Sequence, residues 1–344
     1  MASFNTTRKN ERLFNSPLIK RFSPGSVDDE VSSNEIVYHY TSPEAFLSII
    51  RSHTLRFTDI HYLNDKSEGI YFTKLLLDFM DEYHDKYPLF NEVVNKLLSG
   101  NDYEKIRELA TTAVNYSPVL GQPYKERLFV FCACKDPDSL NMWNYYVNNG
   151  SYQGYNIGFR TANLLKAFDV PDPSVLDAFT VYYGNVIYDS KKQISEIERL
   201  AEWHEARLRY NSAKTHSKFT REHAQYLLYS YIHSYGLFYK HQKFKSEDEF
   251  RIVIEIYDDR VPCSKEAAQK YFGEYNKSIE KGFCCKQGLI VPYLSISFPE
   301  KSIYRITPAP MLEFDIAKSS IRELLLMSGI EKARVDKSSI PIRF

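Results

Sequence analysis

The segment Lys245-Ser246-Glu247-Asp248-Glu249-Phe250-Arg251-Ile252-Val253-Ile254-Glu255-Ile256 joins a cluster of carboxylates to a β-branched run typical of a strand. Residues two apart in a strand lie on the same face, so Glu247, Glu249 and Arg251 are predicted to project together. The apolar residues between them then lie on the opposite face, against the core. Like charges on one face repel, which costs free energy unless a cation or a ligand hydroxyl lies among them.

Two interpretations of this segment follow from its residue types. In the first, it is a solvated edge strand in which Arg251 relieves the repulsion by pairing with Glu249. In the second, Glu247 and Glu249 form a ligand-facing pair of carboxylates at the start of a strand. The segment alone does not decide between them, so the rest of the chain must.

The overall composition is that of a soluble globular protein. The 344 residues include 44 Lys and Arg and 44 Asp and Glu, and 43% are hydrophobic. Because the net charge is zero, no long-range field favours nucleic acid or an anionic membrane, although local basic patches are not excluded. The 27 Tyr and 22 Phe are compatible with stacking pockets as well as with ordinary core packing.

Neither membrane insertion nor secretion is indicated. No apolar run approaches the length needed to cross a bilayer, and the start of the chain lacks the apolar stretch of a secretory signal, so a cytoplasmic protein is expected. The five cysteines do not resemble a disulfide framework. Cys132 and Cys134 share one face of a predicted buried strand, which favours core residues over zinc ligands, and no metal site is predicted.

Residues 36–41 are predicted to form a short strand that runs directly into a helix. Ser42 is a typical N-cap and Pro43 suits the first helical position. Helix N-termini bind anions through their unpaired N–H groups, so His39, Thr41 and Ser42 are candidate ligand contacts. The alternative for His39 is a satisfied core histidine.

Other polar and aromatic residues have two interpretations each. Asn64 either caps a helix or contacts a ligand. Trp143 and Tyr146 lie on one face of a predicted short helix, where they either stack a planar ring or pack in the core.

One α+β domain is predicted over 35–344, because no repeat or interdomain linker interrupts the chain. Residues 1–34 are predicted to form a flexible or wrapping arm. Helical periodicity predicts large insertions at about 69–117 and 190–240, and an amphipathic helix at 264–281.

Five short motifs follow one another along the chain. They are Tyr38-His39-Tyr40-Thr41-Ser42; Tyr62-Leu63-Asn64-Asp65 with Glu68; Asp138-Ser139-Leu140 with Met142-Trp143 and Tyr146; Gly154 with Ile157-Gly158-Phe159; and Lys240-His241 followed by Glu247 and Glu249-Phe250-Arg251. In this order they resemble a prokaryotic family labelled only as a domain of unknown function, over about 36–343. Phe250 departs from that family, which more often has Trp there, and so does the helical stretch at 81–120.

That family in turn is similar to the ADP-ribosyltransferase superfold, whose first core strand carries a His and a later strand opens with the catalytic Glu. The resemblance, closest to the DNA-modifying toxin branch, implies a mixed, split β-sheet core and NAD as substrate. It implies that His39, with Tyr40 and Thr41, binds the nicotinamide ribose and that Glu249 holds its 2′-hydroxyl. Glu247 resembles the first Glu of the arginine-directed branch, but that branch has Arg in place of His39, so the role of Glu247 stays open.

The chemistry of such an enzyme fits these residue types. Cleavage of the nicotinamide–ribose bond develops an oxocarbenium-like cation, which a fixed carboxylate stabilises. Tyr62, Trp143 or Tyr146 could stack the nicotinamide, and Arg56 or Arg251 could hold the pyrophosphate.

The leading hypothesis is therefore an NAD-consuming transferase that modifies a nucleic acid or a protein, of the kind used as toxins or anti-phage defence effectors. It requires the strands of His39 and Glu249 to lie next to each other over a single cleft. A non-enzymatic module that binds a nucleotide or nucleic acid in the same pocket is the alternative. A third hypothesis is a Mg²⁺-dependent nuclease built from Glu247, Glu249 and Asp65, although these residues follow no acidic motif of established spacing. A regulatory partner is compatible with the sequence, and the oligomeric state is not indicated by it.

Overall fold

Two compact units make up the chain. The computed structural model describes residues 16, 18–22, 35–63, 70–98, 114–117, 122–147, 152–168, 179–212, 220–257, 279–286 and 288–341. The first unit comprises Met1–Lys20, Ser67–Pro123 and Ile187–Gln242, and the second comprises Arg21–Lys66, Tyr124–Val186 and Lys243–Phe344.

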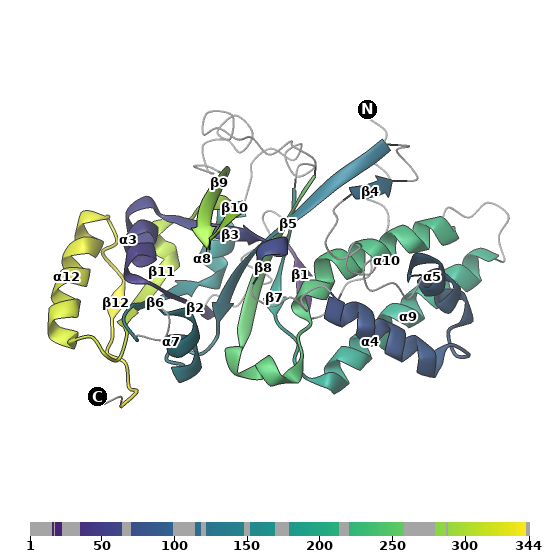
Figure 1. Cartoon of the computed structure of the whole chain (residues 1–344), viewed down its shortest axis with the longest axis horizontal. Helices are drawn as coiled ribbons and strands as arrows, with labels where there is room; N and C mark the ends of the chain where they lie inside the picture. The colour runs from purple at the N-terminus through teal and green to yellow at the C-terminus, as the bar shows by residue number, and fades with distance from the viewer. Residues whose placement is uncertain are drawn as a thin grey trace. The chain divides into compact units, whose positions relative to one another are not determined.

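The first unit is mainly helical (Figure 1). Its elements are α4 (Ile70–Tyr83), α5 (Pro88–Leu98), β4 (Val114–Ser117), α9 (Ser190–Ser212), α10 (Arg221–Tyr235) and the 3-10 turn η5 (Gly236–Phe238). The predicted helical stretches at 69–117 and 190–240 thus belong to one unit. Strand β4 departs from the prediction of helix up to 117; a proline follows it at 118, which disfavours helix at the residue before it.

A buried carboxylate joins two of these helices. Glu205 of α9 accepts a hydrogen bond from the backbone N–H of Phe90 at 2.8 Å, in the first turn of α5. Its other oxygen accepts from Nε of Arg209 at 2.8 Å. An acidic group at a helix N-terminus is stabilising because it satisfies an unpaired N–H and interacts with the helix dipole.

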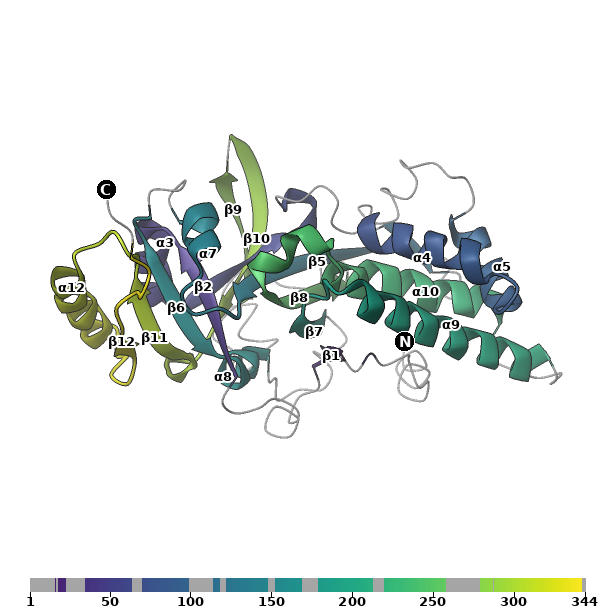
Figure 2. The same cartoon turned by 90° about the horizontal axis from the view of Figure 1, so that it is seen from below.

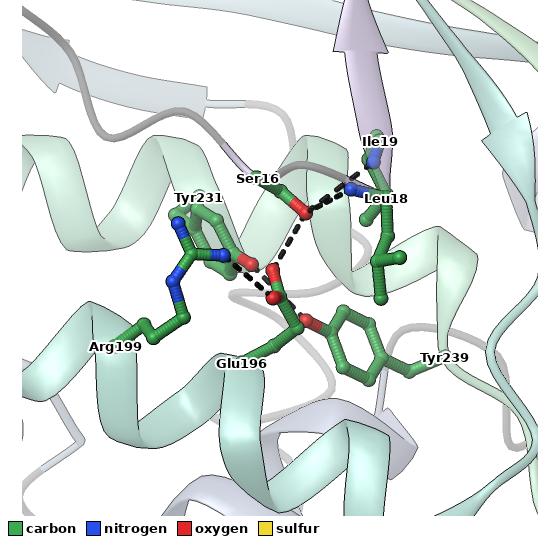
Figure 3. Close-up of polar contacts among 7 residues, drawn as sticks. All are labelled: Ser16, Leu18, Ile19, Glu196, Arg199, Tyr231 and Tyr239. Atoms are coloured by element: carbon green, nitrogen blue, oxygen red, sulfur yellow. Dashed lines mark hydrogen bonds and ion pairs between the residues drawn. The ribbon is translucent and has the colours of Figure 1, made fainter.

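Residue 16 ties the start of the chain to α9 (Figure 3). The hydroxyl of Ser16 donates to Oε2 of Glu196 at 2.6 Å, and Nη1 of Arg199 donates to Oε1 at 2.8 Å. The hydroxyls of Tyr231 and Tyr239 lie 3.1 Å apart beside them, and burial raises the pKa of both phenols, which keeps them protonated. In this described part of the predicted N-terminal arm, the chain packs on the helical unit.

A mixed, largely antiparallel sheet forms the core of the second unit, although residues 19–20 and 122–123 of its strands are assigned to the first unit. The strand order is β1-β7-β8-β5-β2-β6-β11-β12, while β3 pairs with β5 and β10, and β10 with β9. The strands are β1 (Ile19–Arg21), β2 (Ile36–Thr41), β3 (Thr54–Asp59), β5 (Gln122–Cys134), β6 (Tyr155–Arg160), β7 (Phe179–Asn185), β8 (Glu249–Tyr257), β9 (Ile279–Lys286), β10 (Leu289–Ser297), β11 (Ile303–Pro308) and β12 (Arg334–Val335). The α+β class predicted from the sequence is therefore observed.

Short helices connect these strands, and some lie on the sheet. They are α3 (Pro43–Ser52), η1 (Ile60–Tyr62), α7 (Leu140–Tyr146), α8 (Thr161–Leu165), η3 (Lys166–Phe168), η6 (Gln242–Glu247), η8 (Glu300–Ser302) and α12 (Phe314–Met327). In Figure 2, β2 and β6 lie side by side with α3 and α7 close to them. Most of the helix predicted at 264–281 lies outside the described residues, and the sequence from Ile279 onward is a strand instead.

One face of the sheet packs in the apolar core. Phe250, Ile252 and Ile254 of β8 belong to the large apolar core, together with Phe131 of β5 and Val37 of β2. The apolar set of the segment that begins at 245 therefore faces the core as predicted, because side chains alternate along a strand.

One edge of β5 is shared between two strands. Strand β3 pairs with it opposite Phe129 and Val130, whereas β2 pairs with it opposite Cys134. Since the pairing of β5 with β2 is limited to Cys134, the ladder is interrupted on this edge, beside His39.

Gly154 is required where β6 begins, because a Cβ there would lie 2.4 Å from Cγ1 of Val147 and 2.5 Å from the carbonyl oxygen of Thr41. We expect Gly154→Ala to lower the free energy of unfolding by about 1–3 kcal/mol through overpacking. The control is Gly236→Ala, whose Cβ would meet Phe72 at an ordinary 3.5 Å. Urea denaturation of both variants tests this, and equal midpoints would contradict it.

Candidate functional site

The carboxylate of Glu249 opens strand β8 and is paired within its own strand. Nε of Arg251 donates to its Oε2 at 2.9 Å, and Nη2 donates to the same oxygen at 2.5 Å. Both side chains are buried, with Glu249 5% and Arg251 1% exposed. The pairing of Arg251 with Glu249, which the first of the two interpretations of this segment included, is thus observed, but in a buried setting rather than on a solvated edge strand.

Cys134 lies directly opposite Glu249 on β5, and Tyr38 lies opposite Cys134 on β2. Burial raises the pKa of the Cys134 thiol to about 12, and the charges of Asp136, Asp248 and Glu249 act in the same direction. A neutral, buried thiol is a poor nucleophile, so Cys134 serves as a core residue here.

Glu247 does not share the strand of Glu249. It ends the 3-10 turn η6, and Asp248 has a left-handed φ of 40° before β8 begins. The alternation predicted for the two glutamates therefore fails, because it requires extended backbone between them. The hydroxyl of Tyr146 donates to Oε1 of Glu247 at 3.4 Å, which brings α7 to the mouth of β8.

Tyr40 and Trp143 are packed against each other, with ring centroids 4.8 Å apart in an edge-to-face arrangement. The hydroxyl of Tyr40 donates to the carbonyl of Asp136 and accepts from the N–H of Ser139, both at 2.8 Å. Nε1 of Trp143 donates to Oδ1 of Asp138 at 2.9 Å. Both rings are buried, so they form core structure beside Glu249 and expose no face for stacking a ligand.

His39 is half-buried at the interrupted edge of β5. Its Nδ1–H donates to the carbonyl oxygen of Cys132 at 3.3 Å, and its ring lies 5.0 Å from that of Phe131. Burial lowers the pKa of His39 to about 4, so the imidazole is neutral at pH 7. Because Nδ1 carries the proton, Nε2 has an acceptor lone pair, and it makes no hydrogen bond with any residue in the described ranges.

His39 and Glu249 are close in the sheet but differ in face. Strand β5 lies between β2 and β8, which corrects the expectation that the two strands are adjacent. Two strand spacings correspond to about 10 Å between their backbones. Glu249 shares the face of Cys134 and Tyr38, whereas His39, one residue after Tyr38, lies on the face of Phe131.

Ser42 and Thr41 have structural contacts. The hydroxyl of Ser42 accepts from the N–H of Ala45 at 3.3 Å and caps α3, which begins at Pro43 as predicted. One N–H group that was expected to meet an anion is therefore occupied by the cap. Thr41 is buried at the end of β2.

Two of the remaining predicted ligand contacts lie on or just after β3, which pairs with β5 at Phe129 and Val130 rather than at Cys134, the partner of Glu249. Arg56 is exposed on β3 with its guanidinium 4.7 Å from the ring centroid of Tyr293. Tyr62 ends η1 and is partly exposed. Asn64 lies outside the described residues.

Sequence reasoning missed a cluster of charged residues around Asp59. Oδ1 of this buried carboxylate is 2.6 Å from Nδ1 of His61, and Oδ2 accepts from Nη2 of Arg127 at 2.7 Å. Burial by itself would raise the pKa of Asp59, but the hydrogen bonds from His61 and Arg127 outweigh it and hold the pKa below its ordinary value. An Asp at a strand end with a His two residues later was the available signal, but Arg127 joins only through strand pairing.

The described residues contain no group of three His, Cys, Asp or Glu side chains placed to hold a metal ion. Cys132, Cys134, Cys284 and Cys285 are free thiols. Within the same described ranges, no helix combines the length and apolar character needed to cross a membrane.

One family model matches a range that runs from α7 through β6, β7, α9 and α10 to the start of β8. Residues 142–252 match the family described as "Protein of unknown function (DUF2971)". The DUF2971 match contains Trp143, Tyr146, Glu247, Glu249 and Arg251, whereas the strand of His39 precedes it. No curated protein and no solved structure matches the chain.

The ion pair of the DUF2971 region gives a stability prediction. Arg251→Met should lower the free energy of unfolding by about 3–5 kcal/mol, because it leaves the buried Glu249 without this partner. The double variant with Glu249→Gln should recover part of that loss, since the uncompensated charge is removed. Urea denaturation of the wild type, the two single variants Arg251→Met and Glu249→Gln, and the double variant measures the coupling, and strictly additive losses would argue against a mutually compensating pair.

His39 gives a prediction about pH. Its folded pKa of about 4 lies below the ordinary 6.5, so the unfolded chain binds a proton that the folded chain excludes. Its contribution to stability is present above pH 6.5 and is lost as the pH falls towards 4. His39→Gln should therefore lose less stability than the wild type between pH 7 and pH 5 in urea denaturation. The exposed His84→Gln serves as the control and should follow the wild type.

Proposed function

We propose that the chain is an NAD-consuming transferase that moves ADP-ribose to a nucleic acid or a protein. The observation that carries the proposal is His39: a neutral imidazole whose proton is fixed on Nδ1 by the Cys132 carbonyl, at the interrupted edge of β5. In this state Nε2 can accept a hydrogen bond from a ribose hydroxyl.

Glu249 is the group proposed to stabilise the reacting ribose. When the bond between nicotinamide and ribose breaks, positive charge develops on the sugar, and a fixed carboxylate favours that transition state over the ground state. The hydrogen bonds from Arg251 fix the orientation of the carboxylate before substrate arrives. The acceptor then attacks the anomeric carbon and loses a proton, while nicotinamide leaves with the bonding electrons.

The proposal requires the substrate to reach both sides of the sheet. Because the ladder between β2 and β5 is limited to Cys134, the proposed place of entry is beside His39, about 10 Å from the backbone of Glu249. Tyr146 and Glu247 lie at the mouth of β8 and are proposed to contact the substrate there. Tyr40 and Trp143 are assigned a supporting role, because both are buried.

A second candidate is a binding module that recognises a nucleotide without turning it over. The burial of Glu249 in its ion pair with Arg251 favours this candidate, since a carboxylate already neutralised by a neighbour has less charge to offer a developing cation. The two candidates differ in whether nicotinamide is released.

Nicotinamide release from NAD, followed with cell lysate as a source of acceptor, tests the proposal. Glu249→Gln should lower the rate by about 10²–10³-fold, as loss of a transition-state contact does. The matched control is Glu255→Gln on the same strand and face, where the buried carboxylate accepts from the hydroxyl of Tyr182 at 3.1 Å. Glu255→Gln should keep the wild-type rate.

Thermal melting of each variant separates loss of fold from loss of chemistry. Equal rates for the wild type and a folded Glu249→Gln would remove the catalytic assignment. A melting shift with NAD but no nicotinamide release would favour the binding module.

A further inference from the structure

Arginine and tyrosine side chains gather on β6, β11 and β12, which lie side by side in Figure 2. We define the arginine–tyrosine surface as Arg160, Tyr304, Arg305 and Arg334, with the buried ring of Tyr38 on the neighbouring strand β2 packed against Arg305. It belongs wholly to the second unit, and neither the proposed transferase site nor the DUF2971 match accounts for it as a group.

Two guanidinium groups share one aromatic ring on this surface. The Cζ atoms of Arg160 and Arg334 lie 4.5 Å and 5.9 Å from the ring centroid of Tyr304. Nη1 of Arg334 also donates to the Tyr304 hydroxyl at 3.1 Å. Stacking on a ring holds the planar guanidinium flat and leaves its N–H edge available for phosphate oxygens.

Arg305 adds a third guanidinium beside the first two. It is the parallel-strand partner of Arg334, and its Cζ lies 5.3 Å from the ring centroid of Tyr38. Gly158 between them makes this contact possible, because a Cβ there would lie 3.0 Å from the Tyr38 ring and 3.4 Å from Cβ of Arg305.

A β-bulge explains why these side chains converge. The pairing of β11 with β6 shifts between Ile303 and Arg305, which leaves Tyr304 as the extra residue. A bulge interrupts side-chain alternation and re-aims one side chain. Although they are consecutive, Tyr304 therefore contacts Arg160 and Arg334, while Arg305 contacts the ring of Tyr38.

The positive charge of this surface is only partly compensated within the described residues. Asp336 is the carboxylate in ion-pair distance, 3.6 Å from Nη1 of Arg305. The Nε–H of Arg305 is buried and makes no hydrogen bond with a described residue. Arg305 and Arg334 are cross-strand partners and their like charges repel, so an anion bound beside them would lower the free energy.

The same arrangement recurs a short distance along the chain. Nζ of Lys318 and Nζ of Lys337 lie 5.2 Å and 5.9 Å from the ring centroid of Phe314. Lys337 follows Asp336 directly, so the second cation–ring group adjoins the arginine–tyrosine surface in sequence. Cations interleaved with aromatic rings are typical of surfaces that bind single-stranded nucleic acids.

We infer that the arginine–tyrosine surface binds single-stranded nucleic acid. Phosphates would pair with the guanidinium edges, and unstacked bases would stack on the ring and guanidinium planes. An acidic protein could satisfy the charge, but it would not use the flat stacked groups. The zero net charge of the whole chain is compatible with this local site.

The inference is independent of the proposed transferase, because binding is measured without NAD. Glu249 of the proposed transferase site nevertheless lies on the same face of the sheet as Arg305, whereas His39 lies on the other face. Arg305, Gly158, Tyr38, Cys134 and Glu249 occupy a single cross-strand row, so Arg305 and Glu249 lie four strand spacings, roughly 19 Å, apart.

Fluorescence anisotropy with labelled 20-nucleotide single-stranded RNA, single-stranded DNA and duplex DNA tests the inference on the full chain. The wild type should bind the single strands more tightly than the duplex, with affinity falling as salt rises from 50 to 200 mM, because counterions are released on binding. Arg160→Gln and Arg334→Gln should each weaken single-strand binding by about 3–10-fold and reduce the salt slope by about 1. Arg334→Lys should recover only part of the loss, since it restores the charge without the planar group.

The matched control is Arg322→Gln, an exposed arginine of α12 that stacks on no ring among the described residues. It should bind like the wild type. Thermal melting confirms that each variant is folded. Absence of binding at 50 mM salt, equal affinity of all variants, or equal binding of a poly-glutamate peptide would each overturn the inference.

Discussion

Side-chain alternation across three neighbouring strands determines which candidate site residues of the second unit share a face of the sheet. Tyr38, Cys134 and Glu249 are cross-strand partners on β2, β5 and β8, so they share one face. His39 is one residue further along β2 and therefore lies on the other face, against Phe131. Any chemistry that joins His39 and Glu249 must use the place where the β2–β5 ladder stops, because paired strands separate the faces elsewhere.

The buried charges of β8 are the second constraint. Glu249 and Arg251 neutralise each other, and Glu255 further along the strand accepts from the hydroxyl of Tyr182. A buried ion pair contributes little net stability compared with apolar residues, yet removal of one partner is costly. Such a pair can therefore hold the Glu249 carboxylate in a fixed orientation, as the transferase proposal requires. In the binding module, the same pair would only stabilise the fold.

Local signals in the sequence were sufficient for much of the fold. The Ser42 cap and the Pro43 start of α3 depend on hydrogen bonds within a few residues, and the apolar face of β8 depends on alternation within one strand. The pairing of Arg251 with Glu249 was one of two interpretations that the alternation allowed. The position of Glu247 could not be predicted, because the left-handed backbone of Asp248 ends the alternation of side chains. The alternating pattern of a strand does not reveal a turn at a single residue.

The sequence by itself determined the α+β class, the capped helix after β2 and the apolar face of β8, since each follows from neighbours in the chain. Only the tertiary structure decided that β5 separates His39 from Glu249, that Asp59 joins His61 to Arg127, and that three arginines meet around Tyr38 and Tyr304. These relations depend on which strands pair and in which register. Strand pairing joins residues that are far apart in sequence, and its register is set by the packing of the whole sheet rather than by any local pattern.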